Sequence, residues 1–426
     1  MKILKNSLIN LLGVIIPALI IMPVFGYFSR HLTTEEFGIF SISFSILGYS
    51  SLFDAGLSRS VVRLLTIKDK LNLTDGEILG TAVTVVTLIG IILLCTIYMN
   101  AGSLVFILNI SKDLKEVSVN AFKILALAIP FMLINLVIVA RLESSERFNL
   151  FNTIKILSAI ISVLPIIIFP WFMDSFIGAI TGIVVGRVLS LIVSIICIGE
   201  LNLFFKFRFT HLALKKLFEF GGWISISNII SPIMVYFDRF ILSALLGAEK
   251  VAYYTLPSEL VTRINLFPSA LTRAAFPHLS RINDSHSENY QEALSRVKRY
   301  LYLFTFTVVP LMMLCSHLII YYWLGEKFVA ISANILIIML SGYLFNSLSQ
   351  LPVLYLQSIG ITRAIAILHM CEVIPYLILL YFMINRWGLY GAASAWSIRV
   401  IIDNLMLNLI AKYYKNINRI KYKLTQ

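Results

Sequence analysis

Charged residues are scarce in this chain. Asp, Glu, Lys and Arg together supply 13% of its 426 residues, about half the share of an ordinary soluble domain. Apolar residues supply 59%, and a single soluble core stops growing at roughly 250 to 300 residues. The composition therefore excludes a soluble enzyme, a soluble nucleic-acid binder and a disordered chain. It indicates a helical protein that crosses a membrane many times.

Cysteine is scarce as well. The chain has four cysteines, each inside an apolar run, and no Cys-x-x-Cys or Cys/His spacing accompanies them. A disulfide framework and a zinc site are therefore not indicated, and we expect the cysteines to pack as small apolar side chains. Because no sequence pattern indicates catalytic chemistry or a bound nucleotide, we predict no enzyme activity, no metal and no cofactor.

Long apolar runs separated by short polar breaks fill the rest of the chain. At about 20 residues per bilayer crossing, they predict twelve transmembrane helices. The expected spans are residues 8–29, 37–56, 78–99, 119–140, 150–171, 176–199, 221–245, 251–275, 300–323, 330–356, 364–384 and 389–411. The first run lacks the small-residue cleavage site of a signal peptide, so we interpret it as a retained span.

The basic residues between these spans predict the orientation. With the N-terminus in the cytoplasm, the cytoplasmic segments hold 22 Lys and Arg residues and the outer segments hold 6. Such an excess on the cytoplasmic side is the rule for membrane proteins, so we predict that both termini are cytoplasmic. Most of the net charge of +13 then follows from topology, and it does not indicate a nucleic-acid partner.

The two halves of the chain resemble each other. Four local matches recur at offsets of 213 to 216 residues: 32–40 with 246–254, 177–179 with 390–392, Arg141 with Gln357, and Pro17 with Pro232. Parallel repeats of this kind are related by an axis along the membrane normal, and in transporters the substrate site lies between them. We therefore predict two six-helix bundles, residues 1–210 and 211–426, related by a pseudo-two-fold axis along the membrane normal.

Small residues recur at helical spacing in the sixth expected span. Gly178, Gly182 and Gly186 are four residues apart and therefore share one helix face. We expect this face to pack closely against another helix.

Besides Asp54 near the end of span 37–56, eleven charged residues fall inside the expected spans, where an ionised side chain costs roughly 2.5 to 3.5 kcal/mol on insertion scales. Seven are cations and four are acids: Lys123, Lys155, Arg187, Arg239, Arg263, Arg273 and Arg399, and Asp238, Glu259, Glu372 and Asp403. Such residues usually face a partner or a water-filled cavity. The excess of three cations suits a cavity that takes an anion.

Local pairing is the alternative for some of these charges. Glu259 and Arg263 are four residues apart, as are Arg399 and Asp403, so each couple can neutralise itself on one helix face. Lys123, Lys155 and Arg273 can also extend from span ends to the membrane interface.

Two acids do not fit that explanation. Asp238 and Arg239 are adjacent and project about 100° apart, so they cannot pair along one helix face, and we expect at least one to face a lumen. Glu372 has no basic residue within a turn. It is either a protonation site coupled to transport or a neutral, hydrogen-bonded contact between helices.

Several segments resemble one known family. Residues 238–254, which begin Asp-Arg-Phe-Ile-Leu-Ser, look like the seventh-to-eighth helix signature of polysaccharide exporters in the multidrug/oligosaccharidyl-lipid/polysaccharide (MOP) superfamily. Residues 32–40 are similar to its outer turn, and 53–60 to the end of its second helix. Residues 141–148 and 388–393 also fit. The resemblance covers essentially the whole chain. Within the superfamily, the length of the chain and its lack of extra spans are most similar to those of the O-antigen (Wzx-type) flippases.

This resemblance implies an alternating-access transporter with a cationic central cavity in the bacterial inner membrane. Its substrate would be an oligosaccharide repeat unit linked to undecaprenyl pyrophosphate, moved from the cytoplasmic to the periplasmic leaflet. Arg and Lys are the side chains that bind a pyrophosphate. A coupling ion, H⁺ or Na⁺, and an association with the polysaccharide polymerase and chain-length machinery are further expectations.

The resemblance also suggests where the functional residues lie. The candidates for the cavity are Arg187, Asp238, Arg239, Glu259, Arg263, Arg273, Glu372, Arg399 and Asp403. The candidates for a gate or entrance are Arg30, Asp54, Arg59 and Arg63.

Other functions remain open at this point. A drug exporter of the same superfamily should have an acidic cavity, and a flippase for the lipid-linked peptidoglycan precursor typically carries extra helices. A membrane-embedded polymerase or glycosyltransferase needs catalytic residues on a sizeable loop, but loop 276–299 carries no nucleotide-phosphate motif. A scaffold without transport activity would not explain the embedded charges.

Overall fold

The computed structural model describes residues 2–54, 56–145, 147–199, 206–282 and 288–425, and these are almost entirely helical. The described part contains no strand. Each of the twelve expected spans coincides with one helix, one arm of a helix or a run of consecutive helices, which confirms an all-α polytopic membrane protein. Eight described stretches are long and apolar enough by themselves to cross a membrane. The cytoplasmic location of both termini stays a prediction.

The first compact unit comprises residues Met1–Ala252. Its described helices are α1 (Lys2–His31), α2 (Thr34–Ser50), η1 (Ser51–Asp54), α3 (Leu57–Leu71), α4 (Asp75–Met99), α5 (Ala101–Ile107), α6 (Lys115–Ala126), α7 (Ala128–Ser144), α8 (Phe148–Ile168), η2 (Phe169–Trp171), α9 (Ser175–Ile198) and α11 (His211–Leu246).

The second compact unit comprises residues Tyr253–Gln426. Its described helices are α12 (Ala248–Ile264), which begins in the first unit, and α13 (Leu266–Arg281), α14 (Glu288–Leu314), α15 (Ser316–Leu324), α16 (Glu326–Leu348), α17 (Gln350–Ser358) and α18 (Thr362–Thr425).

The predicted boundary between two halves, after residue 210, differs from this division. α11 packs on α2, α3 and α4 and therefore belongs to the first compact unit. A sequence repeat and a compact unit are different properties, because a helix of one repeat can pack on helices of the other. The two six-helix halves stay a prediction.

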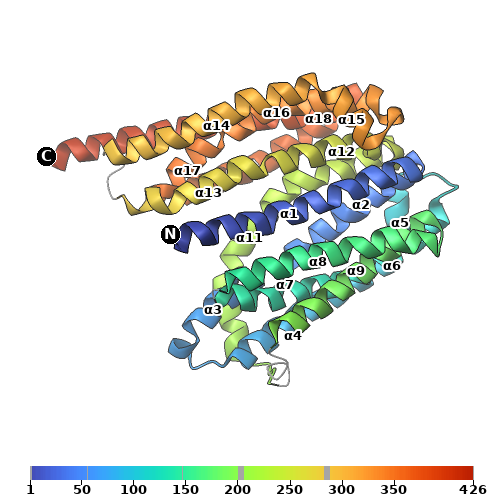
Figure 1. Cartoon of the computed structure of the whole chain (residues 1–426), viewed down its shortest axis with the longest axis horizontal. Helices are drawn as coiled ribbons and strands as arrows, with labels where there is room; N and C mark the ends of the chain where they lie inside the picture. The colour runs from blue at the N-terminus through green and yellow to red at the C-terminus, as the bar shows by residue number, and fades with distance from the viewer. Residues whose placement is uncertain (1, 55, 146, 200–205, 283–287, 426) are drawn as a thin grey trace. The chain divides into compact units, whose positions relative to one another are not determined.

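Close helix packing in the first unit depends on glycine. α8 and α9 lie along each other in Figure 1. A Cβ atom at Gly182 would come within 2.4 Å of the Pro165 carbonyl oxygen, and one at Gly186 within 2.4 Å of the Ser162 carbonyl oxygen. The prediction that the glycine ladder packs against another helix is thereby confirmed. α1 packs on α8, and α7 packs on both α4 and α9.

Several helices begin at residues that satisfy their first backbone N–H groups. Thr33 and Glu36 form a capping box at α2, and Thr74 with Glu77 forms one at α4. Asp174 accepts hydrogen bonds from the first turn of α9. These patterns of Ser, Thr or Asp before an apolar run explain why the helices start where they do.

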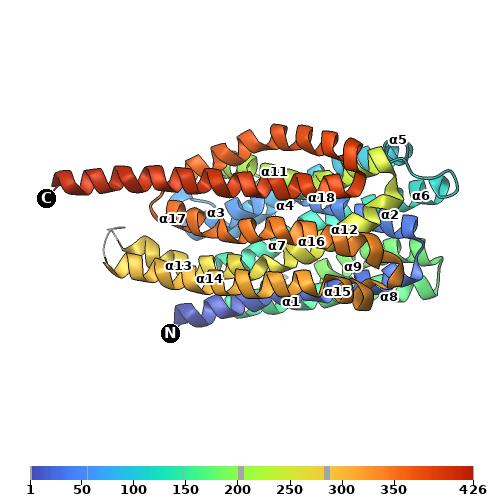
Figure 2. The ribbon, with the colours of Figure 1, turned by 90° about the horizontal axis from the view of Figure 1, so that it is seen from above.

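α18 consists of two arms, and Figure 2 shows the chain doubling back between them. The arms meet at Gly388, whose backbone angles are φ 57° and ψ −132°. Glycine adopts this conformation readily because it has no Cβ atom. A Cβ atom at Gly391 would come within 1.9 Å of the Met383 carbonyl oxygen. The two arms correspond to the last two expected spans, and both pack in the second unit with α16 and α17.

Candidate functional site

Glu259 and Arg263 on α12 form the local ion pair that their spacing allows. The Arg263 Nη2 atom lies 2.8 Å from Glu259 Oε2, and Glu259 is only 7% exposed. A buried carboxylate with a hydrogen-bonded guanidinium has its charge neutralised. This couple therefore adds no net charge to any cavity it lines.

Asp238 and Arg239 on α11 are both 1% exposed. Asp238 Oδ1 accepts a hydrogen bond of 2.7 Å from the backbone N–H of Arg239, and Arg239 Nη1 donates one of 3.1 Å to Ser45 Oγ on α2. The Arg239 side chain therefore connects α11 to α2 inside the first unit. A substrate can reach the two side chains only if these helices separate.

Ser45 belongs to a serine-rich stretch of α2 that the sequence analysis did not single out. Ser41, Ser43, Ser45 and Ser50 are all buried, and each hydroxyl donates to a carbonyl of its own helix. The signal was present in the sequence, because so many hydroxyls in one apolar span are unusual for a helix that faces only lipid.

Four side chains of α18 gather into what we call the α18 cluster: His369 and Glu372 from the first arm, Arg399 and Asp403 from the second. His369 Nε2 lies 3.4 Å from Asp403 Oδ1. Glu372 lies within electrostatic range of the other three. The Arg399 guanidinium lies over the Tyr376 ring, 5.3 Å from its centroid. Sequence reasoning named three members and missed His369, although it lies one turn before Glu372 on the same face.

Asp403 therefore contacts the opposite arm of the hairpin. Its recorded ion-pair partner is His369, 34 positions earlier, and not Arg399 one turn away on its own arm. Both Glu372 oxygens are closed to solvent and have no hydrogen-bond partner within the described residues. The α18 cluster brings together three of the nine predicted cavity residues.

Arg187 on α9 is a cation of the first unit with no recorded ion pair or hydrogen bond among the described residues. At about 100° per residue, it lies opposite the exposed face formed by Leu189, Ile192 and Ile196. The next turn of its own face carries Ser190, whose hydroxyl accepts a hydrogen bond from Asn135 on α7. Arg187 is half-buried and therefore points into the first unit.

Arg273 on α13 lines a polar pocket of about 300 Å³ in the second unit. The pocket lies between α13 and α17, with Gln350 and Gln357 on the α17 side. Thr272 Oγ1 donates to Gln350 Oε1 at 3.5 Å. Arg273 is exposed and has no recorded ion pair among the described residues, so its guanidinium is available to an anion or a sugar hydroxyl.

The residues expected at a gate or entrance lie at two different places. Arg30 is exposed at the end of α1, whereas Arg59 and Arg63 are exposed on α3. The 17 residues of α2 separate these places in the chain, a helix of roughly 25 Å. Asp54 accepts hydrogen bonds from the backbone N–H and the hydroxyl of Ser58 at the start of α3. The structure thus gives Asp54 a helix-capping contact.

Two embedded lysines rest on aromatic rings. The Lys155 ammonium lies 4.0 Å from the Phe151 ring centroid, and the Lys123 ammonium lies 5.3 Å from that of Tyr98. Such cation–π contacts stabilise a cation without an acid. Neither lysine needs a substrate to explain its position.

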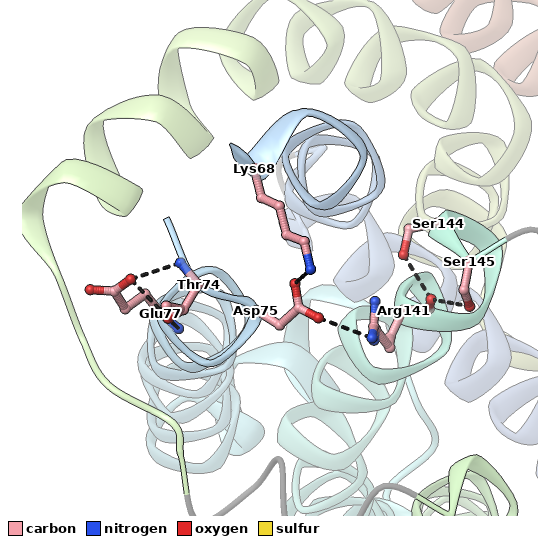
Figure 3. A network of polar contacts seen from close by, with 7 residues as sticks. All are labelled: Lys68, Thr74, Asp75, Glu77, Arg141, Ser144 and Ser145. Atoms are coloured by element: carbon pink, nitrogen blue, oxygen red, sulfur yellow. Dashed lines mark hydrogen bonds and ion pairs between the residues drawn. The ribbon is translucent and has the colours of Figure 1, made fainter. Parts of the chain in front are cut away.

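An ion network that the sequence analysis did not predict joins three helices of the first unit (Figure 3). Asp75, at the start of α4, lies 2.8 Å from Lys68 Nζ on α3 and 3.0 Å from Arg141 Nη2 on α7. Arg141 was singled out only for its place in the repeat. The sequence did not indicate the role of Asp75, because both partners lie on other helices and no residue spacing along α4 predicts such contacts.

No group of three or more His, Cys, Asp or Glu side chains in the described part of the chain has a geometry that could hold a metal ion.

The candidate residues form separate groups: a neutralised pair on α12, a buried contact between α11 and α2, the α18 cluster, and the separate cations Arg187 and Arg273. Nothing in this arrangement resembles a nucleophile with its base.

Comparison with known proteins identifies what the chain is similar to. Residues 3–283 match the family model described as polysaccharide biosynthesis protein. A Shigella flexneri protein described as a "Putative O-antigen transporter" is 37% identical over 408 residues, which cover 96% of this chain and 97% of that protein.

Two solved structures share the fold. A lipid II flippase, MurJ, in an inward closed conformation matches with a TM-score of 0.77 at 18% identity, covering 96% of this chain and 87% of that one. An inward-facing multidrug resistance transporter of the MATE family and MOP superfamily matches with a TM-score of 0.76 at 14% identity, covering 97% and 95%. At these identities the likeness concerns the fold alone.

Proposed function

The chain belongs to the family of polysaccharide biosynthesis proteins, and from this membership we propose that it is an O-antigen flippase. Its substrate is an oligosaccharide repeat unit linked to undecaprenyl pyrophosphate, which it moves from the cytoplasmic to the periplasmic leaflet by alternating access. The observation that carries the proposal is the 37% identity to the Shigella flexneri relative over 96% of this chain.

The charges inside the membrane support an anionic substrate. Transfer of a pyrophosphate through lipid without help is prohibitively costly, and guanidinium groups bind phosphate oxygens with two hydrogen bonds at once. Among the seven embedded cations, Arg187 and Arg273 are the two with no recorded ion pair, hydrogen bond or ring contact in the described residues. We assign each of them, separately, to a contact that the pyrophosphate makes during transport.

The other cavity candidates act differently in this proposal. Arg239 holds α11 to α2, and Asp238 bonds to the Arg239 backbone, so this pair responds when helices of the first unit separate. Glu259 and Arg263 neutralise each other and offer hydrogen bonds to sugar hydroxyls. Arg30, Asp54, Arg59 and Arg63 belong to the gate or entrance, where exposed arginines attract an anionic headgroup.

The proposal has further parts. The protein works in the bacterial inner membrane, where undecaprenyl-linked sugars are made, and an ion gradient drives its turnover. It delivers its product to the polysaccharide polymerase and chain-length machinery. Residues 1–210 and 211–426 are the two halves that move against each other during alternating access.

A complementation experiment tests the function. Cells that lack their own O-antigen flippase receive this protein together with the sugar-assembly genes that belong to it. Arg187→Ala and Arg273→Ala, each with its Arg→Lys counterpart, are compared with Arg386→Ala. Arg386 is the matched control because it is an exposed arginine of the α18 hairpin outside the candidate site. Membrane abundance is measured for every variant.

We expect wild type and Arg386→Ala to restore long surface polysaccharide. We expect Arg187→Ala and Arg273→Ala to lose at least tenfold at equal abundance, with partial recovery in the lysine variants. One lost charge-assisted contact of about 1.4 kcal/mol corresponds to that factor. Full activity of both alanine variants would contradict the assignment of the arginines, whereas failure of the wild type to export its own repeat unit would contradict the function.

A further inference from the structure

Glu372 has an unusual environment for an acid in a membrane helix. Both of its carboxyl oxygens are closed to solvent, and neither has a hydrogen-bond partner in the described residues. An ionised carboxylate accepts up to four hydrogen bonds, and burying one without any costs several kcal/mol. The side chain is therefore held in a form other than a solitary carboxylate.

Asp403 faces the same place from the other arm of α18. It is 8% exposed, and its Oδ1 has no hydrogen bond, although His369 Nε2 lies 3.4 Å away. The Glu372 and Asp403 carboxyls are close enough to interact directly. Two carboxylates that face each other have only acceptors between them, so neither can satisfy the other unless one carries a proton.

Two helices that pack on α18 bring no other ionised group to this place. α16 and α17 pack on α18, and their only charged residues are Glu326 and Lys327 in the first turn of α16. The second arm of α18 contacts α16 near Gly342, about 16 residues or roughly 24 Å further along that helix. The other titratable side chains of α16 and α17 are Tyr343 and Tyr355, and α18 itself supplies His369 and Arg399, with Tyr376 below the Arg399 guanidinium.

The charge balance of the α18 cluster depends on one proton. With both carboxyls ionised, Arg399 charged and His369 neutral, the cluster carries a net charge of −1. With one proton on the carboxyl pair, the net charge is zero. An uncompensated charge inside the membrane is costly, so the neutral form is favoured while the cluster is closed to water. Opening it to water lowers the cost of the charged form.

We propose that Glu372 and Asp403 form a proton-binding site that couples a proton gradient to transport. A proton from water adds to a Glu372 carboxylate oxygen, and the new O–H group donates a hydrogen bond to Asp403. On release, that O–H bond breaks, and the proton returns to water on the side of the membrane to which the cluster is open. His369 and Arg399 meanwhile stabilise the ionised Asp403 carboxylate. This inference rests on the proposed function only for its link to transport, and proton binding itself is independent of the substrate.

The geometry of the two carboxyls suits a proton. No group of three or more His, Cys, Asp or Glu side chains in the described residues could hold a metal ion. A proton needs two facing oxygens, which the hairpin provides.

Infrared spectroscopy of the purified full-length protein in lipid nanodiscs tests the site without any sugar substrate. A protonated carboxyl gives a carbonyl-stretch band that shifts in deuterium oxide and that an ionised carboxylate lacks. Spectra are recorded across a pH series for wild type, Glu372→Gln, Glu372→Asp, Asp403→Asn and Glu259→Gln. Glu259 is the matched control, because it is a buried acid of the same unit whose charge is held by Arg263.

We expect wild type and Glu259→Gln to show one titrating carboxyl band, which Glu372→Gln loses. In Asp403→Asn and in Glu372→Asp its titration midpoint shifts by at least one pH unit. An unchanged band in both Glu372→Gln and Asp403→Asn, or no band in wild type, would overturn the proposal. If the band disappears when sodium chloride replaces choline chloride, the site binds a sodium ion in place of the proton, and the proposal of a proton site is overturned.

The two proposals fail separately. Absence of the infrared band in the wild type would contradict the proton site, but it would not contradict the export function that the complementation experiment measures. Conversely, a protein that fails to export O-antigen but retains the titrating band would keep the proton site and lose the flippase function. Gel filtration and circular dichroism of each variant establish that the altered protein is folded, and Glu372→Asp retains a carboxyl if Glu372→Gln does not fold.

Discussion

Arg239 shows at the level of one residue what a sequence can and cannot predict. Its adjacency to Asp238 excludes pairing along one helix face, and the structure instead turns the Asp238 carboxyl onto the backbone. Its contact with Ser45 could not be predicted, because 194 positions separate the two residues and only the packing of α11 on α2 brings them together. Residue chemistry indicates that a partner is needed, and the fold decides which one.

Replacement of Ser45 by alanine tests this contact. Ser45→Ala removes an acceptor from a buried guanidinium, and hydrogen bonds to charged groups contribute about 1.5 to 3 kcal/mol. We expect the apparent unfolding temperature in detergent to fall by several degrees. Ser43→Ala is the control, because Ser43 is equally buried but bonds only to the carbonyl of Ile39 on its own helix. Equal losses in both variants would mean that the Arg239 contact contributes nothing.

At the scale of helices, hydropathy predicted where the chain crosses the membrane but not how each crossing is built. Four expected spans are each divided into two consecutive α-helices: 119–140, 251–275, 300–323 and 330–356. Such breaks depend on tertiary packing, and hydropathy averaged over a window does not detect them. The fold-back at Gly388 was predictable as a polar break, whereas the contact of His369 with Asp403 depends on how the two arms align.

The ion network around Asp75 is a contact between helices whose strength can be measured (Figure 3). Asp75 is 16% exposed and holds both Lys68 and Arg141. Asp75→Asn leaves two partly buried cations without their acid. The burial of this network is intermediate. Breaking an exposed ion pair costs at most about 1 kcal/mol, whereas removing one partner of a buried pair costs about 3 to 5 kcal/mol. We expect a loss of about 1 to 3 kcal/mol, measured by thermal unfolding of the detergent-solubilised protein.

The matched control for that experiment is Glu292→Gln. Glu292 pairs with Arg296 one turn along α14, and both side chains are more than 60% exposed. Water and salt screen such a pair, so we expect almost no change. A loss equal to that of Asp75→Asn would show that the number of ion pairs, and not their burial, determines stability here.

At the scale of the whole molecule, contacts inside each compact unit support the proposed duplication. Gly178 packs on the backbone of Pro170, and Gly391 packs on that of Met383. Both members of the pair are displaced by 213 residues. The same kind of close backbone contact thus recurs at the offset that a duplication predicts.

The duplication predicts the membrane side of each half, and this decides whether the repeat is parallel or inverted. Lys112 and Lys327 are 215 residues apart, and both are exposed. Parallel halves place both on the periplasmic face, whereas inverted halves place them on opposite faces. Lys215 is exposed in the predicted cytoplasmic connection and serves as the control position.

Cysteine labelling in whole cells reads out these sides directly. The four native cysteines, all free thiols, are first replaced by alanine, and single cysteines are then introduced as Lys112→Cys, Lys327→Cys and Lys215→Cys. We expect a thiol reagent that cannot cross membranes to label the first two in intact cells and the third only after permeabilisation. Because positive charge is concentrated on the cytoplasmic side, labelling of Lys215→Cys in intact cells would contradict the predicted orientation. Labelling of only one of the other two would contradict a parallel repeat.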